Sequence, residues 1–135
     1  GDENSHPRDV LEIQKTVAHE LGHQFFGNVV TCKWWDQIWL NEGFATFFEY
    51  LLVENTHSEL LFRHYFNVQK VQNAFRFDAL ETTRAMLSYA ETPSGISALF
   101  DRIAYDKSGS VIRMFQNAVG EEIFRDSLSF YLNEK

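Results

Sequence analysis

The chain has 135 residues and a mass of 15.8 kDa, the size of one domain or of a piece of a larger one. Hydrophobic residues make up 44% of it, with 13 phenylalanines, so the chain can bury a substantial core and is not expected to be disordered. A net charge of −7, without any basic stripe, argues against a nucleic-acid-binding protein.

Neither a disulfide scaffold nor a membrane span is expected within these residues. The single cysteine, Cys32, cannot form an internal disulfide, and no second cysteine lies near it to share a zinc ion. No apolar run reaches the roughly 18 residues of a bilayer-spanning helix, and no signal peptide is present. The chain lacks an initiator Met and stops at Lys135 inside a helical pattern. We interpret it as a partial segment, and membrane attachment is expected only through parts outside it.

The hydrophobic pattern predicts a mainly α-helical chain. Residues 1–9 are expected to form a lead-in loop, with Asp9 as candidate N-cap of a helix from Val10 to Phe26. Gly27-Asn28 would end this helix, because both residue types are common at helix C-termini. Val29 to Cys32 could form a short extended piece after it.

A second helix is expected from about Leu40 to Asn55, with Asn41 as its candidate cap. Glu42 falls in its first turn, where the partial positive charge of a helix N-terminus favours a carboxylate. Three tryptophans are expected to pack between the two helices and to fix where Glu42 arrives: Trp34, Trp35 and Trp39.

The rest of the chain is expected to be helical as well, with one clear break at Thr92-Pro93-Ser94-Gly95. The segment from Asp78 to Tyr89 has no clear assignment. The further helices are expected over residues 58–77, 96–100, 103–119 (ended by Gly120) and 121–133.

The most informative motif is His19-Glu20-Leu21-Gly22-His23 on the first predicted helix. Two histidines four residues apart lie on one helix face with their Cβ atoms about 6 Å apart, so both rings can reach one metal ion. In Asn41-Glu42-Gly43, a carboxylate from the second helix would supply a third ligand. The alternative is a pair of solvated or hydrogen-bonded histidines on an amphipathic helix, and the second motif counts against it.

This ligand set predicts a catalytic zinc site, because structural sites are closed by four protein ligands and three ligands leave a position open. Two imidazoles and one carboxylate suit zinc, which makes hydroxide available near neutral pH. Glu20 would be the general base that receives a proton from the water and passes it to a leaving amine. The predicted chemistry is hydrolysis of an amide bond.

An amide hydrolase also needs a donor for the oxyanion that forms during the reaction. Tyr105, in Ala104-Tyr105-Asp106-Lys107-Ser108-Gly109, is a candidate. The residues alone do not single it out, because the chain has five tyrosines and a tyrosine beside an apolar helix usually belongs to the core.

Three motifs in order resemble the aminopeptidase N family of zinc exopeptidases, which are gluzincins with the pattern His-Glu-x-x-His-x18-Glu. The resemblance runs from about Val10 over nearly the whole chain, and within the family it points to membrane-bound, extracellular members of the insect gut type. The motifs are the run from His19 to Asn28, the run from Trp34 to Ala45 and the segment from Phe100 to Met114.

The resemblance implies one Zn²⁺ per chain, held by His19, His23 and Glu42. It implies that Glu20 is the base and that Tyr105 stabilises the transition state. Peptides would be the substrates and nucleic acid would not be a partner. The parent protein would lie at the extracellular face of the plasma membrane, with the cytoplasm as the alternative.

The resemblance also implies what is missing. The family's upstream Gly-Ala-Met-Glu-Asn segment, which holds the free amino group of the substrate, has no counterpart here, so this fragment alone could be inactive. Gly22 and Phe26 stand where the family commonly has alanine and tryptophan, and neither change touches a metal-binding atom. The chain would be the helical part of a thermolysin-like catalytic domain without its β-rich lobe: 1–135 as one partial domain, divided into the lead-in loop 1–9, the zinc-binding helix pair 10–55 and a helical subregion 56–135 that carries the tyrosine segment.

Other polar residues have plainer interpretations. Thr46, one turn after the predicted carboxylate ligand, could hydrogen-bond a ligating histidine. Lys107 and Arg113 are expected to be structural ion-pair partners. Three further histidines are expected to be solvated or bonded at the surface: His6, His57 and His64.

Two other functions stay open. One is a catalytically silent receptor or scaffold that keeps the fold, and the presence of all five predicted site residues argues against it. The other is a thermolysin-type zinc endopeptidase, and the tyrosine segment and the tryptophan-rich linker favour the aminopeptidase over it.

Overall fold

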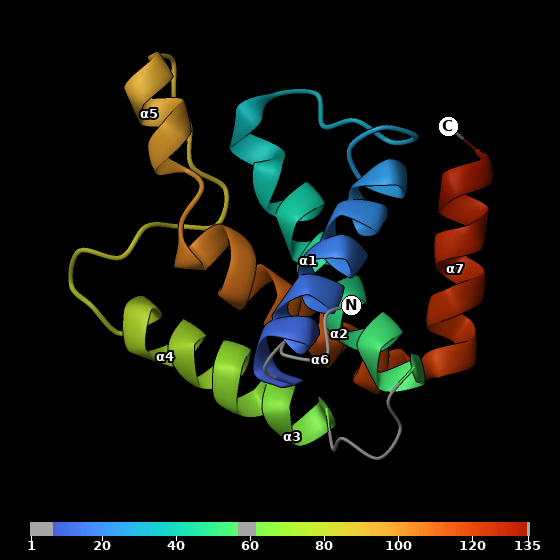
Figure 1. Cartoon of the computed structure of the whole chain (residues 1–135). Coiled ribbons are helices and arrows are strands. Elements are labelled where there is room, and N and C mark those ends of the chain that lie inside the picture. The colour runs from blue at the N-terminus through green and yellow to red at the C-terminus, as the bar shows by residue number, and fades with distance from the viewer. Residues whose placement is uncertain (1–6, 57–61, 135) are drawn as a thin grey trace.

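The computed structural model describes residues 7–56 and 62–134, and the regular elements within them are all helical (Figure 1). The β-type pairing in these stretches is an isolated bridge between Phe26 and Val30, so the extended piece expected after the first helix is only a tight turn. The mainly α prediction is confirmed. The elements are α1 (Pro7–Phe25), the 3₁₀ helix η1 (Trp35–Gln37), α2 (Ile38–Thr56), α3 (Phe62–Phe66), the π-helical η2 (Asn67–Val71), α4 (Gln72–Asp78), α5 (Pro93–Ala98), the π-helical η3 (Ile103–Lys107), α6 (Ser108–Val119) and α7 (Glu121–Asn133).

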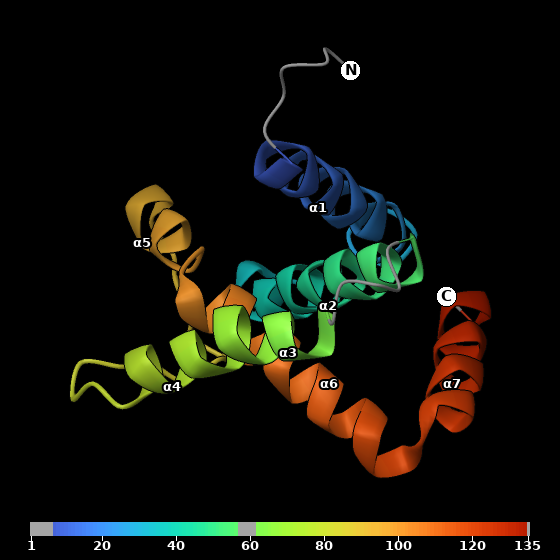
Figure 2. The ribbon, with the colours of Figure 1, turned by 60° about the horizontal axis from the view of Figure 1, so that its bottom comes forward.

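The central helix is α2, with α1 packed on one side of it and α3, η3 and α6 on the other (Figure 2). Because neighbours cover it on both sides, α2 buries residues around most of its circumference. By contrast, α1 is amphipathic: an apolar stripe that includes Ile13, Val17 and Leu21 is exposed. The 3.6-residue period places His19 and His23 on the face opposite this stripe, which lies against α2. None of the described helices is both long and apolar enough to cross a bilayer.

Two apolar clusters hold α2 in place. One joins it to α1 and α3, and the other joins it to α6 and α7. Burial of each large apolar side chain contributes about 1.5–3 kcal/mol relative to exposure. The members are Ala18, Tyr50, Val53 and Phe66 in the first cluster and Phe47, Ile112 and Phe124 in the second.

Glycines let the three helices of the predicted site approach closely. A Cβ atom on Gly22 would lie 3.0 Å from the Cα of Ala45, so α1 and α2 meet almost backbone to backbone. The alanine common at this position in the resembled family would need a slightly wider spacing. A Cβ atom on Gly43 would lie 2.7 Å from Ser108 Oγ and 2.8 Å from its Cβ, so α2 and α6 are in equally close contact. The separation of these helices is therefore set next to Glu42.

We expect Gly43→Ala to lower the free energy of unfolding by about 1–3 kcal/mol, because the added methyl overlaps a side chain of a packed neighbouring helix. Alanine is the better helix former, and the overlap outweighs that gain. Urea denaturation checks the result. In the double variant with Ser108→Gly, the total loss should be smaller than the sum of the two single losses, whereas additive losses would show that the contact is not the cause.

Two of the later predicted helices contain π-helical segments. The run predicted over residues 58–77 is described from residue 62 as α3, η2 and α4, and the run over 103–119 is η3 followed by α6. As predicted, Gly120 ends α6, with a φ of 89° that favours glycine, and α7 has the predicted bounds. Each π segment inserts one extra residue into a helical turn, a feature that is frequent at functional sites.

The predicted caps of the first two helices are wrong. Because α1 already begins at Pro7, Asp9 lies in its first turn, and residues 7–9 belong to the helix and not to a lead-in loop. Because α2 begins at Ile38, Asn41 lies inside it, where its Oδ1 accepts a hydrogen bond from Cys32 Sγ at 3.0 Å. Glu42 is therefore past the first turn, and the N-terminal charge of α2 contributes less to its stability than expected.

The predicted break and the tryptophan packing also need correction. Thr92 is not part of a break: its side chain accepts the Gly95 N–H and caps α5, with Pro93 as the first helical residue. Trp34 and Trp35 do not pack between α1 and α2, since 47% and 42% of their surfaces are exposed.

Candidate metal and catalytic site

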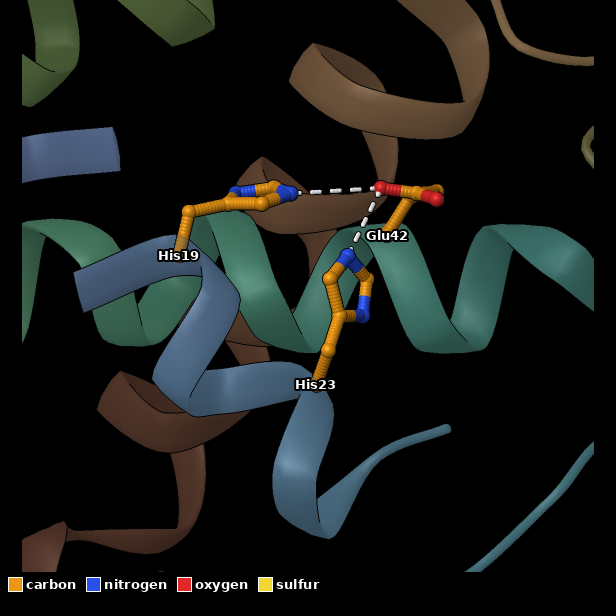
Figure 3. A group of neighbouring side chains, drawn as sticks. All are labelled: His19, His23 and Glu42. Carbon is orange, nitrogen blue, oxygen red and sulfur yellow. Dashed lines mark hydrogen bonds and ion pairs between the residues drawn. The ribbon is translucent and has the colours of Figure 1, made fainter. Parts of the chain in front are cut away.

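Three side chains from two helices meet between α1 and α2 (Figure 3). His19 and His23 lie one turn apart on α1, and each Nε2 is 3.3 Å from the same oxygen of Glu42, Oε2. The Glu42 side chain is 7% exposed, and the two imidazoles are 14% and 24% exposed. The structure thus brings together the three predicted metal ligands, on a face that is partly open.

The donor set fits a zinc ion. Two atoms bound at 2.0–2.1 Å to one tetrahedral zinc lie roughly 3.3 Å apart, which is the length of both histidine–glutamate contacts. The three donor atoms all lie within 4.8 Å of one another, so a small movement of the two imidazoles toward each other would bring all three to the spacing of ligands on one zinc ion. Two imidazole nitrogens and a carboxylate oxygen are also the donor types that zinc prefers.

The other ring nitrogens are already engaged, which fixes both imidazoles. His19 Nδ1 lies 3.3 Å from Glu49 Oε2, and His23 Nδ1 lies 3.2 Å from the carbonyl oxygen of Phe26. Since each of these partners accepts a hydrogen bond from Nδ1–H, the Nε2 atoms are the ones directed to Glu42 and available to a metal.

The contacts between the two histidines and Glu42 stabilise the charged form of each residue and so shift its pKa. Burial lowers the pKa of His19, but hydrogen bonds to Glu42 and Glu49 outweigh it and raise the pKa to about 9. The hydrogen bond to Glu42 likewise raises the pKa of His23. Burial raises the pKa of Glu42, yet its bonds to both histidines hold that pKa at about 2. Without metal, a proton therefore holds His19 and Glu42 together at neutral pH, and metal binding must release it.

Tyr105 lies beside this group. Its ring is 5.9 Å from that of His19, centroid to centroid, and nearly parallel to it. Burial, the charge of Glu42 with a hydrogen bond to it, and the charge of Glu20 all raise the pKa of Tyr105 above its usual value. The phenol is thus a neutral donor at neutral pH, and Glu20, exposed on α1, is close enough to act on it.

The π segment η3 positions Tyr105 and is itself anchored at its start. Asp101 Oδ1 accepts the N–H groups of Ile103 and Ala104, both at 3.0 Å. Arg84 holds the same carboxylate with Nε and Nη2 at 2.8 and 2.7 Å and donates to the carbonyl of Leu99. This clamp ties the segment with no assigned secondary structure to the tyrosine segment, and the sequence patterns gave no indication of it.

Glu49, which the sequence did not single out, contacts His19, whereas Thr46, which it did, makes no such contact. Glu49 bonds His19, whereas the buried hydroxyl of Thr46 has no hydrogen-bond partner. The suggested role of Thr46 is therefore wrong, and Glu49 takes that place. Spacing could have indicated it, because Glu49 follows Glu42 by seven residues and so lies on the same face of α2.

The remaining polar predictions have mixed outcomes. Lys107 pairs with Asp78 at 2.6 Å as a structural contact, as predicted, and Arg113 stacks its guanidinium over Phe66 at 5.2 Å. Cys32 donates to Gln37 and Asn41 and is not part of the group of potential metal ligands. His64 is exposed, whereas His6 and His57 lie outside the described residues.

Comparison with known proteins identifies the family of the chain. The Peptidase family M1 domain matches residues 1–135. The chain is 39% identical over 132 residues to a probable aminopeptidase 2 of Sulfurisphaera tokodaii, covering 98% of this chain and 17% of the relative. It is 38% identical over 133 residues to a leucyl aminopeptidase of Saccharolobus solfataricus, with the same coverage, and 39% identical over 132 residues to endoplasmic reticulum aminopeptidase 1 of Homo sapiens, covering 98% and 14%. The chain thus spans no more than 17% of the length of these relatives.

Proposed function

Because the chain belongs to peptidase family M1, we propose that it is the metal-binding part of a zinc-dependent aminopeptidase, with His19, His23 and Glu42 as the zinc ligands. The observation that carries this proposal is the convergence of both histidine Nε2 atoms on one oxygen of Glu42 at the spacing of zinc ligands. Bound there, zinc supplies a Lewis acid that polarises the substrate carbonyl and lowers the pKa of water.

Glu20 would act as the general base and acid. It lies on α1 next to His19, its side chain is exposed, and its charge reaches Tyr105. A carboxylate there can take a proton from the attacking water and deliver it to the nitrogen of the leaving amine. The carboxylate of Glu42 cannot serve instead, because both histidines engage it.

Tyr105 would donate its hydroxyl hydrogen to the carbonyl oxygen as negative charge develops on it. Its raised pKa keeps the phenol protonated, which a hydrogen-bond donor requires. The stacking of its ring on His19 and the anchored η3 segment hold Tyr105 in place before substrate arrives, so little reorganisation is needed.

Peptides with a free N-terminus are the proposed substrates, since the names of the relatives describe aminopeptidases. The presence of all five predicted residues in one place favours an enzyme over a silent receptor, and the relatives favour an aminopeptidase over an endopeptidase. We keep the extracellular face of the plasma membrane as the proposed location of the parent protein, although one relative is named for the endoplasmic reticulum and others are archaeal.

The function is tested on the full-length protein with a chromogenic aminoacyl amide and with its N-acetylated counterpart. We expect one zinc per protein by elemental analysis, hydrolysis of the free amide only, loss of hydrolysis with a chelator and recovery on adding zinc. Cleavage of a blocked peptide at internal bonds would favour the endopeptidase. Stoichiometric zinc without hydrolysis of any peptide would favour the silent relative.

A further inference from the structure

A buried carboxylate that the proposed chemistry does not use lies behind the metal site. Glu49 is on α2, and its side chain is 10% exposed. Its Oε2 is 3.3 Å from Nδ1 of His19, on the side of the imidazole ring away from Glu42. The ring of His19 is therefore held between two carboxylates from the same helix, one at each nitrogen.

Lys15 holds the other oxygen of this carboxylate. Its Nζ lies 3.5 Å from Glu49 Oε1 and 3.0 Å from Glu12 Oε2, and its side chain is 10% exposed. The ammonium also lies over the rings of Tyr50 and Tyr65, at 5.2 and 5.6 Å from their centroids. Lys15 precedes His19 by one turn of α1, so the two residues lie on the same face of the helix and each contacts one oxygen of Glu49.

The burial of Glu49 makes this arrangement more than a surface ion pair. Burial of a carboxylate is unfavourable unless a charge and hydrogen bonds compensate it. Lys15 compensates the charge, and His19 takes the remaining oxygen. With both oxygens engaged, the carboxylate has one orientation, and it imposes one orientation on the imidazole ring.

We propose that Glu49 is a positioning residue for metal binding, that it orients His19 and strengthens Nε2 as a donor, and that Lys15 acts through Glu49. A carboxylate on the far nitrogen of a ligating histidine fixes the tautomer and raises the basicity of the ligand. This inference rests on the proposed metal site. The simpler alternative is that Glu49 and Lys15 only tie α1 to α2 and affect folding stability alone.

The test measures the zinc dissociation constant of the full-length protein by competition with a chromophoric chelator, at a temperature where circular dichroism shows each variant to be folded. We expect Glu49→Gln to weaken zinc binding by about 10–100-fold, and Lys15→Met to weaken it by a smaller factor. The double variant should bind zinc about as weakly as Glu49→Gln alone, because Lys15 acts through the carboxylate. Glu122→Gln, an exposed charge on α7, is the matched control and should leave the affinity unchanged.

A purely structural role would lower the unfolding temperature of the metal-free protein in each variant while leaving the zinc affinity of the folded protein within about threefold of the parent, and that result overturns the proposal. Additive losses from Lys15→Met and Glu49→Gln would overturn the part assigned to Lys15.

Should Glu49→Gln not fold, Glu49→Asp, which draws the charge back by one methylene, must show the same loss. A parent protein that binds no zinc overturns the proposed function as well, whereas a zinc-loaded, active parent with unaffected variants overturns only this inference.

Discussion

Replacement of Glu20 by glutamine is expected to lower kcat/KM by about 10²–10⁴-fold while the zinc content stays at one per protein. Glutamine keeps the size of the side chain and cannot accept the proton of the attacking water. Within the described residues, the ion pairs that join the three predicted ligands do not involve Glu20, so the metal site should stay intact. Steady-state kinetics with an aminoacyl amide, together with elemental analysis of the same sample, check both halves of this prediction.

Asp9→Asn is the matched control for Glu20→Gln, because it removes a carboxylate from the exposed first turn of the same helix. We expect its activity to stay within about twofold of the parent, since salt largely screens the interaction between an exposed charge at the start of α1 and the metal site near its end. An active Glu20→Gln variant would remove Glu20 from the mechanism. Loss of zinc from it would instead assign Glu20 a role in metal binding.

The parts of the structure that could be predicted depend on local periodicity. His19 and His23 fall on one face of α1 whatever the neighbouring helices do, because the spacing of four residues fixes that. The bounds of α7 could be predicted from its periodicity, whereas α2 could be predicted only from its continuous apolar run, because it buries residues on several faces. What the period could not predict is the distance between α1 and α2, which depends on Gly22 lying directly against Ala45.

Helix starts were predicted less well, because several local signals compete. Asp9 and Asn41 both have side chains that cap helices, but Pro7 and η1 start the two helices earlier. The proline of Thr92-Pro93 predicts a break, but threonine followed by proline is also a favourable helix start, and α5 begins there. A proline between two helical patterns therefore predicts either a break or a new helix, and only the surrounding packing decides.

Contacts between distant segments were the least predictable. Glu49 lies two turns from Glu42, which places it about 20° around the helix from it, whereas Thr46 lies about 40° away. That difference favours Glu49 as the partner of His19, but it matters only once α1 is known to lie against this face. The clamp of Arg84 on Asp101 joins two segments without a helical pattern, so no periodicity could have indicated it.

Tyr105→Phe is expected to lower kcat by about 10²–10³-fold, the loss found when one donor to a developing oxyanion is removed. The zinc affinity should not change, because the ring that stacks on His19 is kept and only the hydroxyl is lost. KM should change little if the donor acts mainly on the transition state. Kinetics and zinc titration of the variant measure these three quantities.

Tyr89→Phe provides the control, because this tyrosine is exposed and carries the same change away from the site. A fall in zinc affinity of Tyr105→Phe, with kcat per bound zinc unchanged, would show that the hydroxyl orders Glu42 instead of acting on the substrate. A fall in kcat with full zinc loading would indicate that the Tyr105 hydroxyl acts on the oxyanion of the substrate. This distinction is necessary because Glu42 lies close enough to Tyr105 for its charge to raise the pKa of the phenol.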